Sequence, residues 1–499
     1  MFERIRPEEA GISSKTVQKF LEKIHQRGAV MHSLLLVRDG KIFAEHYWAP
    51  YDQDSLHRMY SQTKSYVAMG IGLLVDEGKL NLDDKIADHF RDKIKGEIPT
   101  EVEELTVRNM LTMTTAGNVA NWFREKVHDR TEFYFTERTN LRSQGTIWQY
   151  DSAGSQVLGA LVERLSGMKL LDYLKEKMFN KMGTFKNARI LMIPNGDSWG
   201  DSALYCTARD MASGGQLLLQ GGKWNGEQLL SEQFVKDATS PLVCNQENFM
   251  PHALNYAGYG YQIWGAPGGF AFVGMGDQLT ICIPDKKFMF VCTADHQVAI
   301  GAGTQGSMRT VLVNALYDFI IDNLADAPLE RDDEAYAGYV NYTSNLKLRA
   351  SVGSEDSPLR EKINGVVYEC EKNQMGITSF SFVFKDKTEG EFRYRNAQGD
   401  KVIPFGVNHN VFGKFPQLGY SSEMGVLETN DGFMYNDAVS LAWRDDNKLI
   451  VDVKIIDKYL GSASFFFGFS GDRAAANFTK AAEAFLEEYS GTLYATAKK

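Results

Sequence analysis

The sequence predicts an α+β fold followed by a β-rich C-terminal domain, and three observations lead to this prediction. The chain has 499 residues, which exceeds the usual size of one domain. Within the first 328 residues, strand patterns lie near both ends and helical patterns lie between them. After Pro328, apolar residues recur with a period of two. We therefore expect a mixed domain over residues 1–328 and a β-rich domain over residues 335–499.

A hairpin and a buried helix open the first domain. Residues 33–47 contain two apolar segments joined by Asp39-Gly40, a dipeptide typical of tight hairpin turns. From Ser61 to Asp76, apolar residues occupy most sides of a predicted helix, as expected for a helix buried nearly all round.

Further helices and a second hairpin complete this domain. Helical spacing over 157–165 predicts one helix, and Thr207-x-x-Asp210 is a capping-box pattern that starts another. Strands at 279–283 and 288–292, joined by a turn, precede a helix at 308–323.

Short alternating segments predict the architecture of the second domain. They are numerous and separated by turn signals, which is typical of a small sandwich or a barrel, a lipocalin-like barrel included. The charged stretch at 330–334 resembles a linker, and we expect a last helix from Ala474 to Tyr489.

Composition excludes several classes of function. No apolar run approaches the roughly 20 residues that cross a bilayer, so we expect no membrane span. The net charge of −10 is scattered along the chain and disfavours a nucleic-acid partner. The charged N-terminus lacks the apolar stretch of a signal peptide, which predicts a cytoplasmic protein.

No metal site or cofactor motif is apparent. The cysteines are far apart and form no Cys-x-x-Cys or Cys/His cluster, so we expect buried free thiols, no metal and no cofactor. A metalloenzyme and a Ser-His-Asp hydrolase with a nucleophile elbow are the weaker alternatives. The five cysteines are Cys206, Cys244, Cys282, Cys292 and Cys370.

Ser61 is the candidate nucleophile because it opens an apolar helix and Lys64 follows three residues later. Residues three apart share one helix face, so the Lys64 ammonium can reach the Ser61 hydroxyl. A serine hydroxyl needs such a neighbour to become a good nucleophile. The alternative is a structural role, in which the serine caps the helix and the lysine lies on the surface. The same spacing recurs, outside such a setting, at Ser166/Lys169 and Ser344/Lys347.

Two later segments offer partners for Ser61. Tyr150, followed by Ser152 just ahead of a helix, carries a phenol that can act as general base and acid beside a lysine. Gly274 and Met275 lie in a glycine-containing strand end, where a free backbone N–H could join that of Ser61 as an oxyanion hole. Taken alone, each segment is more often a core tyrosine or an ordinary glycine turn.

The order of these elements resembles the serine β-lactamase and penicillin-binding superfamily, in particular its class C branch, over roughly residues 5–325. The resemblance implies that Ser61 forms an acyl-enzyme, that Lys64 is proton acceptor or charge partner, and that Tyr150 is general base and acid. The family's Tyr-x-Asn ends in Ser152 here, a partial match. The resemblance rests on 59–65, 76–84, 107–115, 150–152, 208–211, 222–226 and 272–278.

One departure from the family bears on specificity. Where relatives carry a Lys/His-x-Gly triad, this chain has Phe272-Val273-Gly274 and lacks the cation that would bind a substrate carboxylate. We therefore expect a small-molecule ester or amide substrate and an esterase or amidase rather than an efficient β-lactamase, unless Arg124 or Arg142 supplies the charge. The alternatives are a β-lactamase, a D-aminopeptidase, or a catalytically idle binding protein of the same fold. A homodimer is one expected assembly.

Overall fold

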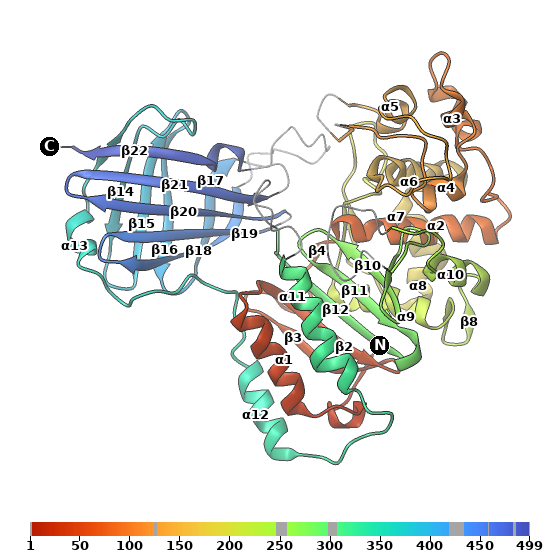
Figure 1. Cartoon of the computed structure of the whole chain (residues 1–499), viewed down its shortest axis with the longest axis horizontal. Helices are drawn as coiled ribbons and strands as arrows, with labels where there is room; N and C mark the ends of the chain where they lie inside the picture. The colour runs from red at the N-terminus through yellow and green to blue at the C-terminus, as the bar shows by residue number, and fades with distance from the viewer. Residues whose placement is uncertain are drawn as a thin grey trace. The chain divides into compact units, whose positions relative to one another are not determined.

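The computed structural model describes residues 2–120, 122–123, 127–245, 257–297, 307–418, 434–457, 459–482 and 486–498. These residues form two compact units (Figure 1). The described residues up to His296, together with 307–347, make up the first unit, and Gln297 and the described residues from Leu348 onward make up the second.

A seven-stranded sheet forms the centre of the first unit. All neighbouring strands are antiparallel except the short pair β1 and β3. The predicted hairpin is confirmed as β2 and β3, and the predicted strands after Phe270 are confirmed as β11 and β12. In sheet order the strands are β1 (Glu3–Arg4), β3 (Lys41–Tyr47), β2 (Met31–Arg38), β12 (Phe288–Ala294), β11 (Gln278–Ile283), β10 (Gly269–Gly274) and β9 (Trp264–Ala266).

Helices bury both faces of this sheet. In β2, Leu34 and Leu36 join a core that includes α1 (Ser14–Gln26) and α11 (Ser307–Ala315). Leu35 and Val37 join the core on the other face. A sheet buried on both faces explains why β2 appears as a continuous apolar run rather than an alternating one.

Three helices on this second face position the candidate site. They are α2 (Thr63–Asp76), α6 (Ser152–Ser166) and α9 (Ala208–Leu219), and all three were predicted. The capping box between Thr207 and Asp210 is present at the start of α9. Within the described residues, no helix combines the length and apolar character needed to cross a bilayer.

The remaining elements of the first unit are short. The strands are β4 (His57–Arg58), β5 (Arg189–Ile190), β6 (Leu204–Cys206), β7 (Lys223–Trp224) and β8 (Glu227–Gln228). The α-helices are α3 (Thr100–Glu103), α4 (Val107–Leu111), α5 (Arg130–Thr136), α7 (Leu170–Leu174), α8 (Asn180–Met182), α10 (Glu232–Thr239) and α12 (Asp333–Thr343). The 3-10 and π turns are η1 (Glu8–Ala10), η2 (Tyr60–Gln62), η3 (Ile86–Lys93), η4 (Lys175–Phe179), η5 (Pro284–Lys286), η6 (Leu316–Ile320) and η7 (Ile321–Asn323).

The first unit includes helix α12 and ends at Lys347. We expected the first domain to end at residue 328 and the second to begin at residue 335. The helix packs on α1, and its Tyr339 is buried in the same core as α1 and shares a short hydrogen bond with His46 Nε2. That the two segments are separately folding domains stays a prediction.

A closed barrel forms the second unit, drawn in blue in Figure 1. Its strands follow the order β16-β15-β14-β13-β22-β21-β20-β19-β18-β17, and β16 also pairs with β18, which closes the ring. The bounds are β13 (Tyr368–Cys370), β14 (Ser379–Phe384), β15 (Glu389–Asn396), β16 (Gly399–Val407), β17 (Val411–Leu418), β18 (Met434–Asp445), β19 (Lys448–Ile456), β20 (Leu460–Ser470), β21 (Arg473–Ala482) and β22 (Gly491–Ala497), with α13 (Leu359–Ile363) and η9 (Glu487–Tyr489).

Packed aromatic rings fill the barrel. The rings of Phe382 and Phe467 have centroids 5.0 Å apart, and those of Phe465 and Phe478 stack at 4.0 Å. These four side chains are fully buried or nearly so. A barrel of this size with inward-facing rings is a packed core, which accounts for the period-two pattern of large apolar residues.

The predicted helix from Ala474 to Tyr489 is wrong. Residues 473–482 form strand β21, and among the described residues the 3-10 turn η9 follows before β22. The alanine-rich sequence favours a helix locally, but Ala474, Ala476 and Phe478 alternate into the barrel core. Pairing with β20 and β22 on both sides outweighs that local preference.

Asp437 in β18 is a buried carboxyl group without a hydrogen-bond partner for either side-chain oxygen within the described chain. Burial raises the pKa of Asp437 from 3.8 to about 7. The unfolded chain loses this proton near pH 4, whereas the folded barrel retains it to about pH 7. The free energy of unfolding should therefore fall as the pH rises between these values and level off above them.

We predict that Asp437→Asn stabilises the barrel at pH 8 by on the order of 2–4 kcal/mol relative to its effect at pH 4, because the amide cannot ionise. Urea unfolding of both proteins at several pH values measures this difference. Asp472→Asn, at an exposed turn, is the matched control and should show no such trend. A gain for Asp437→Asn that is equal at pH 4 and pH 8 would contradict the prediction.

Candidate active site

Ser61 lies in the 3-10 turn η2, between strand β4 and helix α2. The preceding residue, Tyr60, has a φ of 47°, a conformation that costs energy for a residue with a large side chain. Its ring is buried and stacks under the Arg58 guanidinium at 4.5 Å. The Met59 N–H donates to the Leu204 carbonyl at 2.7 Å. These contacts hold the strained turn in place.

Gln62 joins this turn to the central sheet. Its side chain is fully buried, and its amide donates to the carbonyls of Phe272 in β10 and Gln278 in β11, both at 3.3 Å. Gly274 ends β10 directly against the turn, because a Cβ atom there would lie 2.2 Å from the Met59 carbonyl oxygen. The turn with Ser61 and the strand end with Met275 are thus held side by side.

Lys64 lies one helical turn after Ser61 and is 1% exposed. Its Nζ donates to the Ser61 Oγ at 3.1 Å and to the Asp201 carbonyl at 2.8 Å. The Asp201 carboxylate lies 3.6 Å from the same nitrogen. These oxygen atoms accept hydrogen bonds from the Lys64 ammonium and keep it beside the Ser61 hydroxyl.

Tyr150 approaches Lys64 from the segment before α6. Lys64 Nζ lies 5.2 Å from the centre of the Tyr150 ring, and the ring stacks on Trp264 at 5.7 Å. Among the described residues, the Tyr150 hydroxyl makes no hydrogen bond to Ser61 or Lys64. Catalytic hydrogen bonds often form only once substrate is bound. Tyr150 therefore stays in the candidate site with Ser61 and Lys64.

Ser152 stays a predicted contact of Lys64 or of a substrate carbonyl. It is the first residue of α6 and, within the described chain, forms no hydrogen bond with Lys64. Asp201 supplies the oxygens that contact Lys64 instead. The structure thus brings together Ser61, Lys64, Tyr150 and the end of β10, and leaves Ser152 at the helix start.

A buried ion pair supports the strand end at Gly274. Asp277 accepts from Arg309 at 2.5 Å and from His296 Nδ1 at 2.8 Å, and Arg309 also donates to the Gly274 carbonyl at 3.2 Å. His296 Nε2 accepts from the Val30 N–H, so the proton lies on Nδ1. Burial alone would raise the pKa of Asp277, but Arg309 and His296 lower it to about 2. The Arg309 charge is therefore already neutralised by Asp277.

Phe272 starts the segment where we expect the family's Lys/His-x-Gly triad, and it is an apolar residue in place of the cation. Phe272 is fully buried and packs edge-on against Tyr66 at 6.0 Å. Arg142 lies on the segment before Tyr150, where it donates to Asn118 at 3.1 Å and Gln149 at 2.7 Å. Burial lowers the pKa of Arg142. Arg124, the other expected candidate, lies outside the described residues.

A second serine pattern needs a correction. A Ser-His-Asp hydrolase is the weaker alternative on the ground that the chain has no Gly-x-Ser-x-Gly pattern, and that ground is wrong, because Gly196-Asp197-Ser198-Trp199-Gly200 has this form. Ser198 lies in an isolated bridge with Met192 rather than at a strand-to-helix turn, and it is 1% exposed. Its N–H donates to Glu163 at 3.3 Å. This serine has a structural role.

The described residues contain no cluster of histidine, cysteine and acidic side chains that could hold a metal ion. All five cysteines are free thiols. Cys206, Cys282 and Cys292 are buried as expected, whereas Cys370 is half-buried and Cys244 is exposed.

Comparison with known proteins agrees with this arrangement. A family model described as Beta-lactamase matches residues 14–314. The chain belongs to the beta-lactamase family. The match covers the first unit from α1 to α11, and with it Ser61, Lys64, Tyr150 and Gly274.

Two curated proteins share part of the sequence. The chain is 26% identical over 219 residues to a 6-aminohexanoate-dimer hydrolase of Paenarthrobacter ureafaciens, across 41% of this chain and 56% of the relative. It is 24% identical over 187 residues to penicillin-binding protein 4* of Bacillus subtilis, across 34% and 40%. The chain thus spans about half the length of these relatives.

A solved structure shows the same fold. A putative 6-aminohexanoate-dimer hydrolase from Bacillus anthracis superposes with a TM-score of 0.52 at 18% sequence identity. The superposition covers 65% of this chain and 89% of that chain. The beta-lactamase fold of the first unit is therefore shown by sequence and by structure.

Sequence reasoning missed Asp201 and Gln62 as residues that hold this site. Asp201 is 137 positions from Lys64, and no local pattern connects the two. Gln62 was visible only as a polar residue at the start of an apolar helix, which could indicate a buried hydrogen-bonded role.

We predict that Gly274→Ala destabilises the protein by about 1–3 kcal/mol, because the new methyl group meets the Met59 carbonyl oxygen. The displaced turn should also slow acylation of Ser61 by at least about tenfold. Urea unfolding and the rate of labelling by a fluorophosphonate measure the two effects.

Gly468→Ala is the matched control, because Gly468 also lies in a strand and nothing lies within 4 Å of its added Cβ. It should leave both quantities nearly unchanged. Equal effects of the two substitutions would show that Gly274 does not set the position of the Ser61 turn.

Proposed function

We propose that this chain is a serine hydrolase that cleaves an ester or amide bond through an acyl-enzyme on Ser61. The observation that carries the proposal is the 3.1 Å contact between the buried Lys64 ammonium and the Ser61 hydroxyl. The name of one sequence relative, a 6-aminohexanoate-dimer hydrolase, supports the same class of reaction.

Each side chain has one role in the proposed reaction. The Asp201 oxygens hold Lys64 as a charge partner, and Lys64 in turn stabilises Tyr150 as a phenolate. The Tyr150 phenolate accepts the Ser61 proton while the Ser61 oxygen attacks the substrate carbonyl carbon. The N–H groups of Ser61 and Met275 stabilise the resulting oxyanion.

Collapse of this intermediate breaks the ester or amide bond. Tyr150 returns its proton to the departing alcohol or amine, which leaves the acyl group on Ser61. A water molecule then gives a proton to Tyr150 and attacks the acyl carbon, and the proton returns to Ser61 as the acid leaves.

The neighbourhood of β10 supports a preference for uncharged substrates. Phe272 is turned into the core, and Arg309 is paired with Asp277. A substrate carboxylate placed beside β10 would lose water, and Arg309, the described cation at this strand end, is already paired with Asp277. An esterase or amidase is therefore the better candidate than an efficient β-lactamase.

We predict that a fluorophosphonate or a slow ester labels Ser61, and that Lys64→Ala and Tyr150→Phe each slow acylation by at least about a hundredfold. Intact-protein and peptide mass spectrometry locate and time the adduct. Ser61→Ala should abolish labelling. Ser166→Ala, at the second Ser-x-x-Lys, is the matched control and should not change it.

An adduct on a serine other than Ser61 would overturn the proposal. Near-normal rates in Tyr150→Phe would move the role of base to Lys64. No adduct with any ester or phosphonate would favour the idle binding protein.

We also predict that p-nitrophenyl butyrate is hydrolysed with a kcat/KM on the order of a hundredfold above that for nitrocefin, corresponding to about 3 kcal/mol of desolvation. Both substrates are measured on one enzyme preparation. Arg142→Gln should change neither value by much. Nitrocefin turnover that equals ester turnover and is lost in Arg142→Gln would show that Arg142 supplies the cation.

A further inference from the structure

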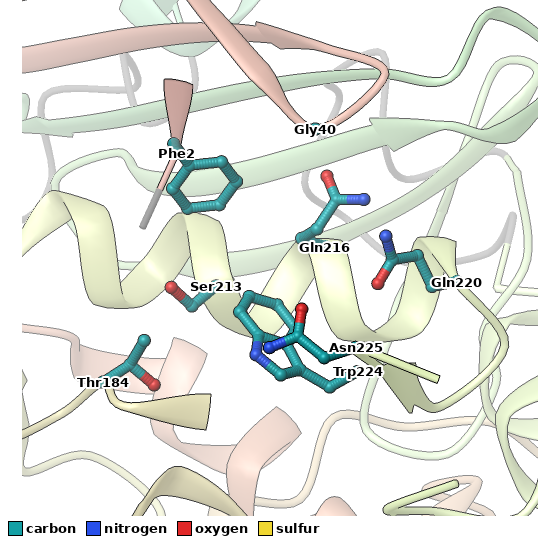
Figure 2. A pocket seen from close by; sticks show the side chains of 8 residues that line it. All are labelled: Phe2, Gly40, Thr184, Ser213, Gln216, Gln220, Trp224 and Asn225. Atoms are coloured by element: carbon teal, nitrogen blue, oxygen red, sulfur yellow. The ribbon is translucent and has the colours of Figure 1, made fainter. Parts of the chain in front are cut away.

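A cavity of about 160 Å³ lies over helix α9 (Figure 2). Ser213, Gln216 and Gln220 line it from this helix, and their spacing of three and four places them on one face. Residues on the opposite side attach the helix to the core, because a Cβ atom at Gly215 would lie 2.5 Å from Met289 and 2.7 Å from Thr280. The polar row is thus held on a closely packed helix.

Two tight turns border the cavity. Gly40 lies at the tip of the β2–β3 hairpin, and Asn225 at the tip of the β7–β8 hairpin. Each turn has two residues with positive φ, as in the rigid two-residue hairpin turns. An ion pair of 2.8 Å between Lys181 and Glu227 joins the second hairpin to α8. The border is therefore largely formed before any ligand binds.

Two lining groups have hydrogen-bonding capacity that the chain does not use. The Thr184 hydroxyl is buried and has no hydrogen-bond partner within the described residues. The Gln216 side-chain amide also forms no hydrogen bond there, and its polar atoms face the open space of the cavity. A buried donor or acceptor without a partner costs about 1–3 kcal/mol, so such groups indicate a ligand or water that satisfies them.

The chemistry of the lining restricts the ligand. Among the described residues that line the cavity none carries a charge, so a charged ligand would lose its hydration without compensation from them. The amides of Gln216, Gln220 and Asn225 both donate and accept, as hydroxyl groups of a ligand do. In Figure 2 the rings of Phe2 and Trp224 lie on opposite sides of the polar row, where an aromatic face can cover an apolar ring face.

We propose that this cavity binds one neutral sugar ring. A cavity of roughly 150 Å³ is large enough for a six-membered ring. The ring hydroxyls satisfy the amides of the α9 row and the Thr184 hydroxyl, and Trp224 covers a face of the ring. The site does not use Ser61, Lys64 or Tyr150, so the proposal stands apart from the hydrolase reaction.

Binding of D-glucose, D-galactose and N-acetyl-D-glucosamine to the full chain tests the proposal, by saturation-transfer NMR and by calorimetry. At least one sugar should bind with a Kd on the order of millimolar, as expected for a ligand of this size. D-glucuronate and D-glucosamine, which carry a charge, should bind at least about tenfold more weakly.

Gln216→Leu and Thr184→Val should each weaken sugar binding at least about fivefold without lowering the melting temperature, since Thr184→Val removes a buried hydroxyl that has no partner within the described residues. Gln233→Leu, an exposed glutamine on α10, is the matched control and should bind as the wild type does. The proposal fails if no neutral sugar saturates, if the charged sugars bind equally well, or if Gln216→Leu and Thr184→Val both bind like the wild type. Labelling of Ser61 is measured separately, so loss of one activity does not imply loss of the other.

Discussion

The buried amide of Gln62 connects the turn that carries Ser61 to the ends of β10 and β11, and the arrangement of the candidate site depends on this connection. A primary amide placed between two strand carbonyls has little freedom, because each lost hydrogen bond would leave a buried group unsatisfied. The close approach of Gly274 to Met59 is possible only with this attachment and without a side chain. A strained residue at Tyr60 can persist because the surrounding contacts determine its position.

The first unit contains two buried pairs of oppositely charged side chains near the candidate site. Lys64 lies beside Asp201, and Asp277 is paired with Arg309. Breaking a buried pair costs several kcal/mol, because the remaining charge has no water to solvate it. The pairs therefore restrict where further charge can enter, and this restriction underlies the proposed preference for an uncharged substrate.

Aromatic packing stabilises the second unit. Its barrel interior is filled by aromatic rings, which bury much apolar surface and leave little room for polar groups. Asp437 is the exception among the groups discussed, and its raised pKa follows from its burial. Strand pairing there also converts an alanine-rich segment that favours a helix into β21.

The sequence by itself determined the elements whose signals are local. Hairpin turns, a capping box, a helix apolar on all sides and period-two segments each depend on neighbouring residues, and they predicted β2 and β3, α2, α9 and the β-rich character of the second unit. The spacing of Ser61 and Lys64 is local too. Only the tertiary structure decided that Asp201 contacts Lys64, that Gln62 spans two strands and that α12 belongs to the first unit. Those contacts join residues far apart in the chain, and their energies depend on burial and pairing that no short segment encodes.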